Sequence, residues 1–332
     1  MTASDPANWP LIPRGSSFED HTVGRMFDHH WGRTVHASDN VFFTTQMLAF
    51  NPLHFNRELA TAAGHPDEVV NPLLVFAIVF GLSVEDLSEG GGPFLGANDL
   101  RYLREIYPGE TLYASSTVVE ARESGSRPDA GIVTWHTVGR GSDGKPVIEF
   151  RRTNLVARRV TGRDLAPVPD GFAEDFRVGD RFRHARTRTV TDIDLNGFTL
   201  LVMNTATGHF SEQEMEDTPF GERINFGGLT LALTVGLATQ DTSGQLLREE
   251  GLDDIRFATP VRHGDTIGAA SEVLAVEPDG TQARVSFRHY GINQRGEIVC
   301  QTTRTVRVRS RAALANHAGN GSATTPAAPI ER

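Results

Sequence analysis

The sequence predicts an α+β protein made of two tandem copies of one domain, each with a long central helix wrapped by an antiparallel sheet. Three observations lead to this prediction. The two halves of the 332-residue chain match each other at a constant spacing, each half contains one long apolar segment, and each half ends in three segments with strand character.

The internal repeat is the first of these observations. Residues 23–27 (Val-Gly-Arg-Met-Phe) resemble residues 178–182 (Val-Gly-Asp-Arg-Phe), which lie 155 positions later. The same spacing matches further pairs along the chain: His54 with His209, Gly81 with Gly236, and Gly141 with Gly296. One ungapped register from about residue 20 to 155 indicates that the two halves are copies of one domain.

The elements of each copy follow the same order. A surface helix is expected over residues 38–47 and 192–203, followed by a buried apolar segment over 69–82 and 226–238. The apolar segments are long enough for helices, although their β-branched content leaves buried strands open. Strands with turn-formers between them come last: 111–121, 131–138 and 147–157, then 266–276, 282–290 and 298–308. One central helix with successive antiparallel strands in each copy makes a double hotdog.

These elements set the domain boundaries. We expect an N-terminal hotdog domain over residues 18–158 and a C-terminal one over 172–309, joined by a proline-containing connection at 158–175. Residues 310–332 are rich in Ala, Gly, Asn, Thr and Pro and lack apolar periodicity, so we expect a disordered tail.

Composition excludes several classes of protein. A net charge of −10 argues against nucleic-acid binding, and no apolar run approaches the roughly 20 residues of a membrane helix. Residues 1–17 contain no apolar core of a secretory signal. The single cysteine, Cys300, excludes an internal disulfide and a cysteine metal cage. We therefore expect a cytoplasmic protein without a metal or redox cofactor.

Two motifs carry a resemblance to a known family. Residues 51–56 (Asn-Pro-Leu-His-Phe-Asn) and the pair Gly227-Gly228 resemble the MaoC-type hydratase/dehydratase family of hotdog proteins, whose signature is Gly-Asp-x-Asn-Pro-Leu-His. The first copy has Ala49 where the family has its catalytic Asp, and the second copy has Asn204 there. The chain is most similar to a double-hotdog subgroup that includes the mesaconyl-CoA hydratases. The likeness covers residues 18 to 309 and includes residues 73–81, 107–112 and 204–210.

The resemblance implies a reaction and its partners. We expect reversible hydration and dehydration of a short-chain, branched or dicarboxylic 2-enoyl-CoA, with coenzyme A present only as part of the substrate, by a homodimer. Three alternatives stay open: a general (R)-specific enoyl-CoA hydratase, a hotdog thioesterase, and a non-catalytic acyl-CoA-binding subunit. The last is credible because neither copy keeps the family's Asp.

The chemistry favours the second copy. An enolate oxygen that develops on a thioester needs hydrogen-bond donors, and free N–H groups at a helix start supply them. Gly227 and Gly228 leave such groups accessible, and Gly228 is the better match to the family's glycine, whereas the first copy has Pro72 and Leu73 at these positions.

We then expect His209 to carry out the acid–base chemistry, because histidine is the side chain suited to exchanging protons near neutral pH, with Asn204 to orient water or the imidazole. A carboxylate that replaces the missing Asp has three candidates nearby: Asp192, Asp194 and Glu212. His54, in the first copy, is a secondary candidate and is more readily explained as a relic or a structural histidine.

Other conspicuous residues are given structural or surface roles. They are His29 and His30 beside Trp31, Cys300, the surface arginines Arg256, Arg262 and Arg288, and the Gly90–Pro93 turn, which lacks the Lys-Ser/Thr of a phosphate loop.

Overall fold

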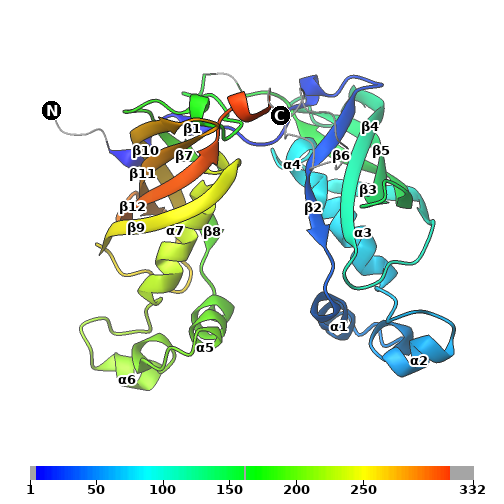
Figure 1. Ribbon diagram of the computed structural model, residues 1–332, viewed down its shortest axis with the longest axis horizontal. Coiled ribbons are helices and arrows are strands. Elements are labelled where there is room, and N and C mark those ends of the chain that lie inside the picture. Colours follow the sequence, from blue (N-terminus) through cyan, green and yellow to red (C-terminus); the bar gives the residue numbers. More distant parts are fainter. Residues whose placement is uncertain (1–4, 161, 315–332) are drawn as a thin grey trace. The chain divides into compact units, whose positions relative to one another are not determined.

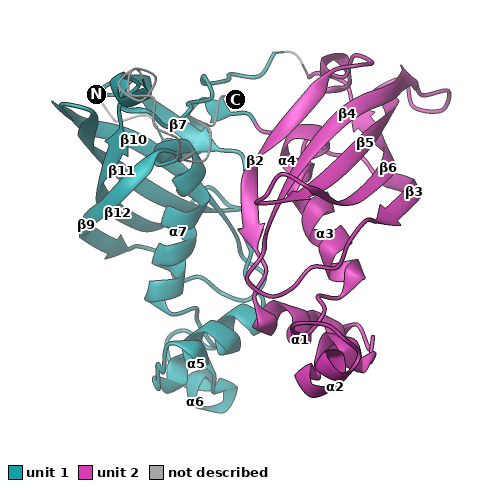
Figure 2. Ribbon diagram, turned by 45° about the vertical axis from the view of Figure 1, so that its right-hand side comes forward, with its two compact units in different colours: residues 1–13, 162–332 teal, residues 14–161 magenta. Residues whose placement is uncertain are grey.

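The computed structural model describes residues 5–160 and 162–314. The chain divides into two compact units (Figure 2): an N-terminal unit of residues 14–161, and a C-terminal unit in which residues 1–13 join residues 162–332. The short strand β1 (Leu11–Ile12) pairs in parallel with β7 (Arg181–His184), which accounts for the N-terminal segment belonging to the second unit.

The N-terminal unit is a five-stranded antiparallel sheet with one long helix against it. The strand order is β2-β4-β5-β6-β3, with bounds β2 Met26–Thr34, β3 Phe94–Tyr102, β4 Thr111–Glu123, β5 Ala130–Gly141 and β6 Pro146–Ala157. The helices are α1 Ala37–Gln46, α2 Arg57–Ala62, α3 Pro72–Leu82 and α4 Val84–Leu87. Buried residues of α3 pack with buried residues of β4 and β6 in one core cluster.

The C-terminal unit repeats this architecture. Its strand order is β1-β7-β10-β11-β12-β9, and β8 also pairs with β10. The remaining bounds are β8 Arg188–Thr189, β9 Leu246–Phe257, β10 Thr266–Asp279, β11 Gln282–Asn293, β12 Ile298–Arg309, α5 Thr199–Leu201, α6 Glu212–Glu216 and α7 Gly227–Thr242, with a π-helical stretch at Ile193–Phe198 before α5. Helix α7 lies against β10, β11 and β12 (Figure 1). Each unit is therefore a hotdog, and the chain is a double hotdog.

Both central apolar segments are helices, which resolves the open helix-or-strand question. Helix α3 begins later than expected because Pro72 occupies its first position and the Asn71 side chain caps it. Helix α7 extends about one turn further than expected, to Thr242. It is buried on the face that carries Leu229 and Leu233.

The six predicted strands are all present, but the sequence reading gave no bounds for β1, β2, β7 and β8 and missed β3 and β9. Every residue of β9 is exposed, and β3 is nearly as exposed, so neither strand shows the apolar alternation of a half-buried strand. Asp99 and Asp254 also adopt left-handed backbone conformations within them. Both are edge strands, with irregular pairing that a sequence pattern does not display.

The single ungapped register of the repeat is wrong for the last two strands. Leu112 and Ile267 are 155 positions apart, but their cross-strand partners, Gly141 and Asn293, are 152 apart. The cause is the β4–β5 connection, which is longer than the tight turn between β10 and β11. Gly141 therefore corresponds to Asn293 and not to Gly296.

The start of the predicted tail is tied to the C-terminal unit. The Ser310 hydroxyl contacts Glu174, and the Arg311 guanidinium pairs with Asp170 and Asp175 at 2.7 and 2.5 Å. Residues 310–314 are thus ordered, and residues 315–332 lie outside the described residues. Across the described part of the chain, no helix combines the length and apolarity that crossing a membrane requires.

Candidate active site

The two histidines of the repeat occupy the same local structure. His209 Nδ1 lies 2.9 Å from the carbonyl oxygen of Ile224, and His54 Nδ1 lies 2.9 Å from that of Val69. A carbonyl only accepts, so Nδ1 carries the proton in each neutral imidazole and Nε2 holds the lone pair. His209 is less buried than His54. In the C-terminal unit Nε2 of His209 is therefore set to accept a proton.

Asn204 stands where the first copy has Ala49. The backbone N–H of each residue donates to a threonine carbonyl at 3.0 Å, Thr199 and Thr44 respectively. The Asn204 side-chain oxygen accepts the Ala206 N–H at 3.0 Å. This bond orients the amide and leaves its NH₂ group as the donor that can hold a water molecule.

The starts of the two central helices differ in one decisive way. In the N-terminal unit Pro72 has no N–H, and the Asn71 side chain accepts the Leu73 N–H at 3.0 Å. In the C-terminal unit Phe226 is the N-cap residue and offers no side-chain acceptor. Within the described residues, the N–H groups of Gly227 and Gly228 consequently have no acceptor. The second helix start is an open donor site, and the first is closed.

Two phenylalanines surround these glycines, and the sequence reading missed both. A Cβ on Gly228 would lie 2.3 Å from the Phe226 ring, and one on Gly227 would lie 2.8 Å from the Phe257 ring. The Phe226 ring is also 5.9 Å from the His209 ring, centroid to centroid. Asn71 before Pro72 was a readable capping signal, but nothing in the sequence marked Phe257 as a neighbour.

The three candidate carboxylates are held in other interactions. Asp194 pairs with Arg188 and accepts the Thr191 N–H at 2.9 Å. Asp192 and Glu212 both pair with Arg223, at 2.9 and 2.5 Å. The hydrogen bond from Arg223 lowers the pKa of Glu212, as expected for a carboxylate held ionised by a cation.

Arg223 therefore has a positioning role that the sequence did not reveal. Its guanidinium also donates to the Asn196 side chain at 3.2 Å, so it joins α6 to the stretch before α5. It directly precedes Ile224, whose carbonyl fixes His209.

An Asp–His–Ser arrangement with a buried histidine and a buried serine is found among the described residues of each unit. In each, histidine Nδ1 faces an aspartate at 2.6–2.7 Å and Nε2 faces a serine hydroxyl at 2.7–2.8 Å: His29 with Asp86 and Ser116, and His184 with Asp241 and Ser271. The serine hydroxyls are 2% and 0% exposed as residues, so these groups join strand to helix rather than meet a substrate. His29 of the His29-His30 pair thus has the structural role expected for it.

Cys300 is buried, and burial raises the pKa of its thiol, so it is an unreactive packing residue. Of the surface arginines, Arg256 lies 3.8 Å from Asp254 and Arg262 pairs with Glu222 at 2.6 Å.

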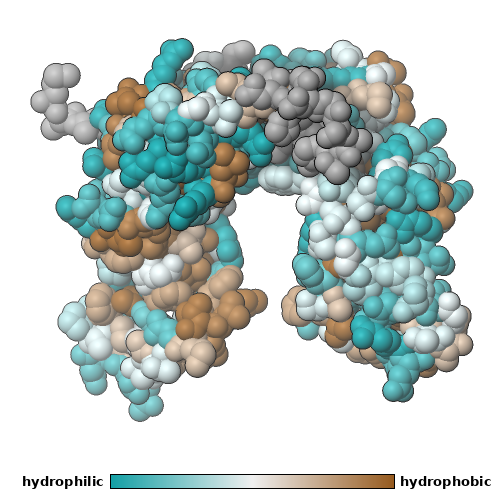
Figure 3. Space-filling view, viewed as in Figure 1, coloured by the Kyte–Doolittle hydropathy of each residue, from teal (hydrophilic) through white to brown (hydrophobic). Residues whose placement is uncertain are grey.

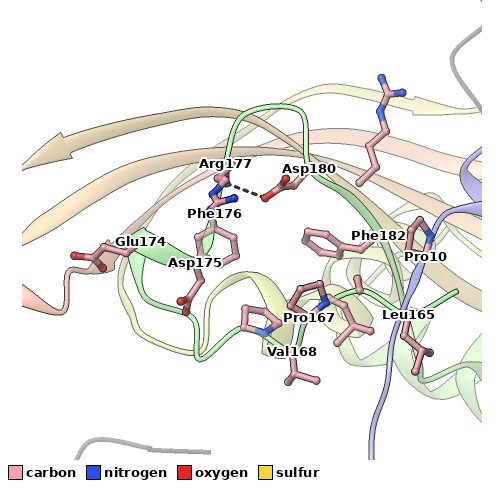
Figure 4. Close-up of a pocket in the computed structure, with 14 residues that line it drawn as sticks. Pro10, Leu165, Pro167, Val168, Glu174, Asp175, Phe176, Arg177, Asp180 and Phe182 are labelled. Atoms are coloured by element: carbon pink, nitrogen blue, oxygen red, sulfur yellow. Dashed lines mark hydrogen bonds between the residues drawn. The ribbon is translucent and has the colours of Figure 1, made fainter.

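The C-terminal unit has two further surface features. A cavity of about 480 Å³ in the C-terminal unit is lined by prolines of the connection with Phe176 and Phe182 (Figure 4), and includes none of the predicted site residues. Apolar side chains gather on the lobe that carries α5 (Figure 3), where Leu200, Leu201 and Met203 are 64%, 73% and 86% exposed.

A hotdog domain with a histidine beside an uncapped helix start fits a protein of the hydratase/dehydratase class. The chain belongs to the mesaconyl-CoA hydratase family, whose family model matches residues 11–171 and 163–310. It is accordingly a hydro-lyase, and the resemblance noted in the sequence is confirmed.

Two curated relatives agree with this assignment. The chain is 31% identical to the mesaconyl-CoA hydratase of Haloarcula hispanica, over 89% of this chain and 91% of the relative. It is 28% identical to the β-methylmalyl-CoA dehydratase of Chloroflexus aurantiacus, over 79% and 82% respectively. A solved MaoC domain dehydratase of Chloroflexus aurantiacus is 25% identical over 90% of this chain and 98% of that one, with a TM-score of 0.43.

Proposed function

We propose that the chain reversibly hydrates mesaconyl-CoA, or a closely related short dicarboxylic 2-enoyl-CoA, in its C-terminal unit. The observation that carries this proposal is the contrast between the helix starts. The donors at Gly227 and Gly228 are free, whereas Asn71 and Pro72 close the same place in the N-terminal unit. Of the two central helices in the described part of the chain, α7 alone begins with free donors for an oxyanion.

The roles of the residues follow from their geometry. The thioester oxygen lies at the N–H groups of Gly227 and Gly228, with Gly228 the principal donor, and these stabilise the enolate oxygen as it forms. Nε2 of His209 removes a proton from water while the oxygen of that water bonds to the β-carbon. The imidazolium then returns the proton to the α-carbon, so no net proton is gained or lost.

Asn204 occupies the position of the family's catalytic Asp, but an amide cannot act as a general acid or base. Its NH₂ group donates to the oxygen of the attacking water and holds it near His209, but takes up no proton. One histidine thus serves as base and then as acid. This assignment needs no metal or redox cofactor, and coenzyme A enters only with the substrate.

The N-terminal unit has a supporting role in this proposal. His54 repeats the geometry of His209, but Ala49 replaces the water-holding amide and the helix start is capped. We also propose a homodimer as the working form.

The test is the loss of enoyl-thioester absorbance when the purified protein meets mesaconyl-CoA and, separately, crotonyl-CoA. His209→Ala should lower kcat about 10³-fold, whereas the matched His54→Ala should change it less than about threefold. Turnover of crotonyl-CoA alone would favour a general enoyl-CoA hydratase. Equal losses in the two variants would refute the choice of unit, and silence of the wild type on both esters would favour a non-catalytic acyl-CoA-binding subunit.

A further inference from the structure

Each unit buries one arginine at the same place in its sheet. Arg152 on β6 lies opposite Trp135, and Arg304 on β12 lies opposite Phe287, so the pairing register makes the two arginines equivalent. They are 0% and 1% exposed. In each, Nη2 donates to a serine hydroxyl at 3.1 Å, Ser88 for Arg152 and Ser243 for Arg304. The duplication thus provides an internal comparison for a buried cation.

The two arginines differ in their counter-charge. Glu249 on β9 accepts from Nε of Arg304 at 3.1 Å and from Nη2 through its other oxygen, while Nη1 lies 3.3 Å from the Thr242 hydroxyl. Nε and Nη1 of Arg152 are buried and have no hydrogen-bond partner in the described part of the chain. A buried cation without a carboxylate is costly unless something else completes it.

In the N-terminal unit, Phe94 lies at the position that Glu249 occupies in the C-terminal unit. Phe94 pairs with Asn154 on β6 and Glu249 pairs with Val306 on β12, with the same register irregularity after each. Phe94 therefore occupies the position of Glu249, and it is 48% exposed. Since the Glu249 side chain is itself 52% exposed, this position borders solvent in the second unit while the guanidinium behind it is buried.

The remaining surroundings of Arg152 leave it charged and short of acceptors. Its guanidinium carbon lies 4.4 Å from the Phe80 ring centroid and 5.1 Å from that of Trp135, contacts that offset part of the burial cost. Burial lowers the pKa of Arg152 to about 10, so the group stays protonated at neutral pH.

A second polar group faces the same side of the strand. Asn154 is 3% exposed, two residues along β6 from Arg152, and replaces the apolar Val306 of the second unit. Its side-chain oxygen is buried without a partner among the described residues. With the amide turned over, its NH₂ group takes the place of this oxygen and can donate to an anion.

We propose that Arg152, with Ser88 and Asn154, forms a binding site for a carboxylate group in the N-terminal unit. The bound carboxylate takes the place that Glu249 fills in the second unit, and Phe94 moves aside at its entrance. The carboxylate belongs to a free dicarboxylate, so this site does not rest on the proposed function.

The test measures thermal unfolding with and without mesaconate, an unsaturated dicarboxylate. Mesaconate should raise the Tm of the wild type by a few degrees and should lose this effect in Arg152→Met. Phe94→Glu supplies the carboxylate internally, so it should raise the Tm of the free protein and abolish protection, whereas the matched Phe94→Gln should remain protected. If mesaconate did not raise the Tm of the wild type, the proposal would be overturned. The same holds if mesaconate raised the Tm of Arg152→Met and Phe94→Glu as much as that of the wild type.

Because protection is measured without turnover, a protein inactive on every ester would refute the proposed function and leave this site to be judged on binding.

Discussion

Capping the second central helix should inactivate the protein while stabilising it, and Phe226→Asn is the substitution that does so. Phe226 has backbone angles of −70° and 144°, close to the −54° and 124° of Asn71. An asparagine there should accept the Gly228 N–H as Asn71 accepts that of Leu73, at about 3.0 Å. The donor needed by the developing enolate would then be occupied.

The magnitudes can be worked out against Phe226→Ala, which also removes the ring beside His209 but adds no cap. An asparagine N-cap is worth about 1 kcal/mol over alanine, which corresponds to a Tm about 2–4 °C higher for a unit of this size. Loss of one oxyanion donor lowers kcat about 10²–10³-fold. Phe226→Asn should therefore be more stable than Phe226→Ala and far less active.

Circular dichroism melting and steady-state hydration of mesaconyl-CoA measure the two effects on the same samples. The loss should appear in kcat more than in KM, because the donor acts on charge that develops in the transition state. If Phe226→Asn were more stable than Phe226→Ala and had a kcat within about threefold of it, a capped helix start would be compatible with catalysis and the reasoning would fail.

Three further predictions concern stability. His184→Leu removes two buried hydrogen bonds and should cost about 2–4 kcal/mol of unfolding free energy in urea titrations, with kcat per folded molecule unchanged; a loss of kcat would place the buried Asp–His–Ser group in catalysis. Met203 and Leu48 adopt left-handed backbone conformations, with φ of 57° and 54°. Met203→Gly and Leu48→Gly should each raise the free energy of unfolding by about 0.5–1 kcal/mol, because glycine adopts this conformation without strain. A lower Tm in both variants would contradict the claim that these residues are strained. Burial lowers the pKa of His21 to about 4 from 6.5. The neutral imidazole therefore contributes its full stability above pH 6.5, and the free energy of unfolding should fall by about 3 kcal/mol as the pH is lowered from 6.5 to 4. His21→Gln should flatten the pH dependence of unfolding in this window, and an unchanged slope would assign it to other groups.

The sequence was most informative where the repeat and the apolar periodicity agree. The pairing of His54 with His209 and of Leu73 with Gly228 predicted equivalent positions that the structure places in equivalent local geometry. The hotdog architecture followed from the same comparison, because two buried helices and six regular strands leave strong patterns.

What the sequence could not show depends on contacts across the fold. The longer β4–β5 connection shifts the register of the last two strands, so an ungapped comparison places Arg152 on Arg307 and conceals its equivalence with Arg304. Edge strands exposed on both faces have no apolar period to detect. The proximity of Phe257 to Gly227 joins residues that only the folded sheet brings together.

The position of a bound thioester tests the central claim most directly. Butyryl-CoA has no double bond to hydrate, so a crystal structure of its complex would hold the ester in place. The account predicts one ester per chain, with its carbonyl oxygen about 2.7–3.1 Å from the amide nitrogen of Gly228 or Gly227 and its β-carbon facing Nε2 of His209. An ester carbonyl at the start of α3 beside His54, or one without contact to either glycine, would contradict it.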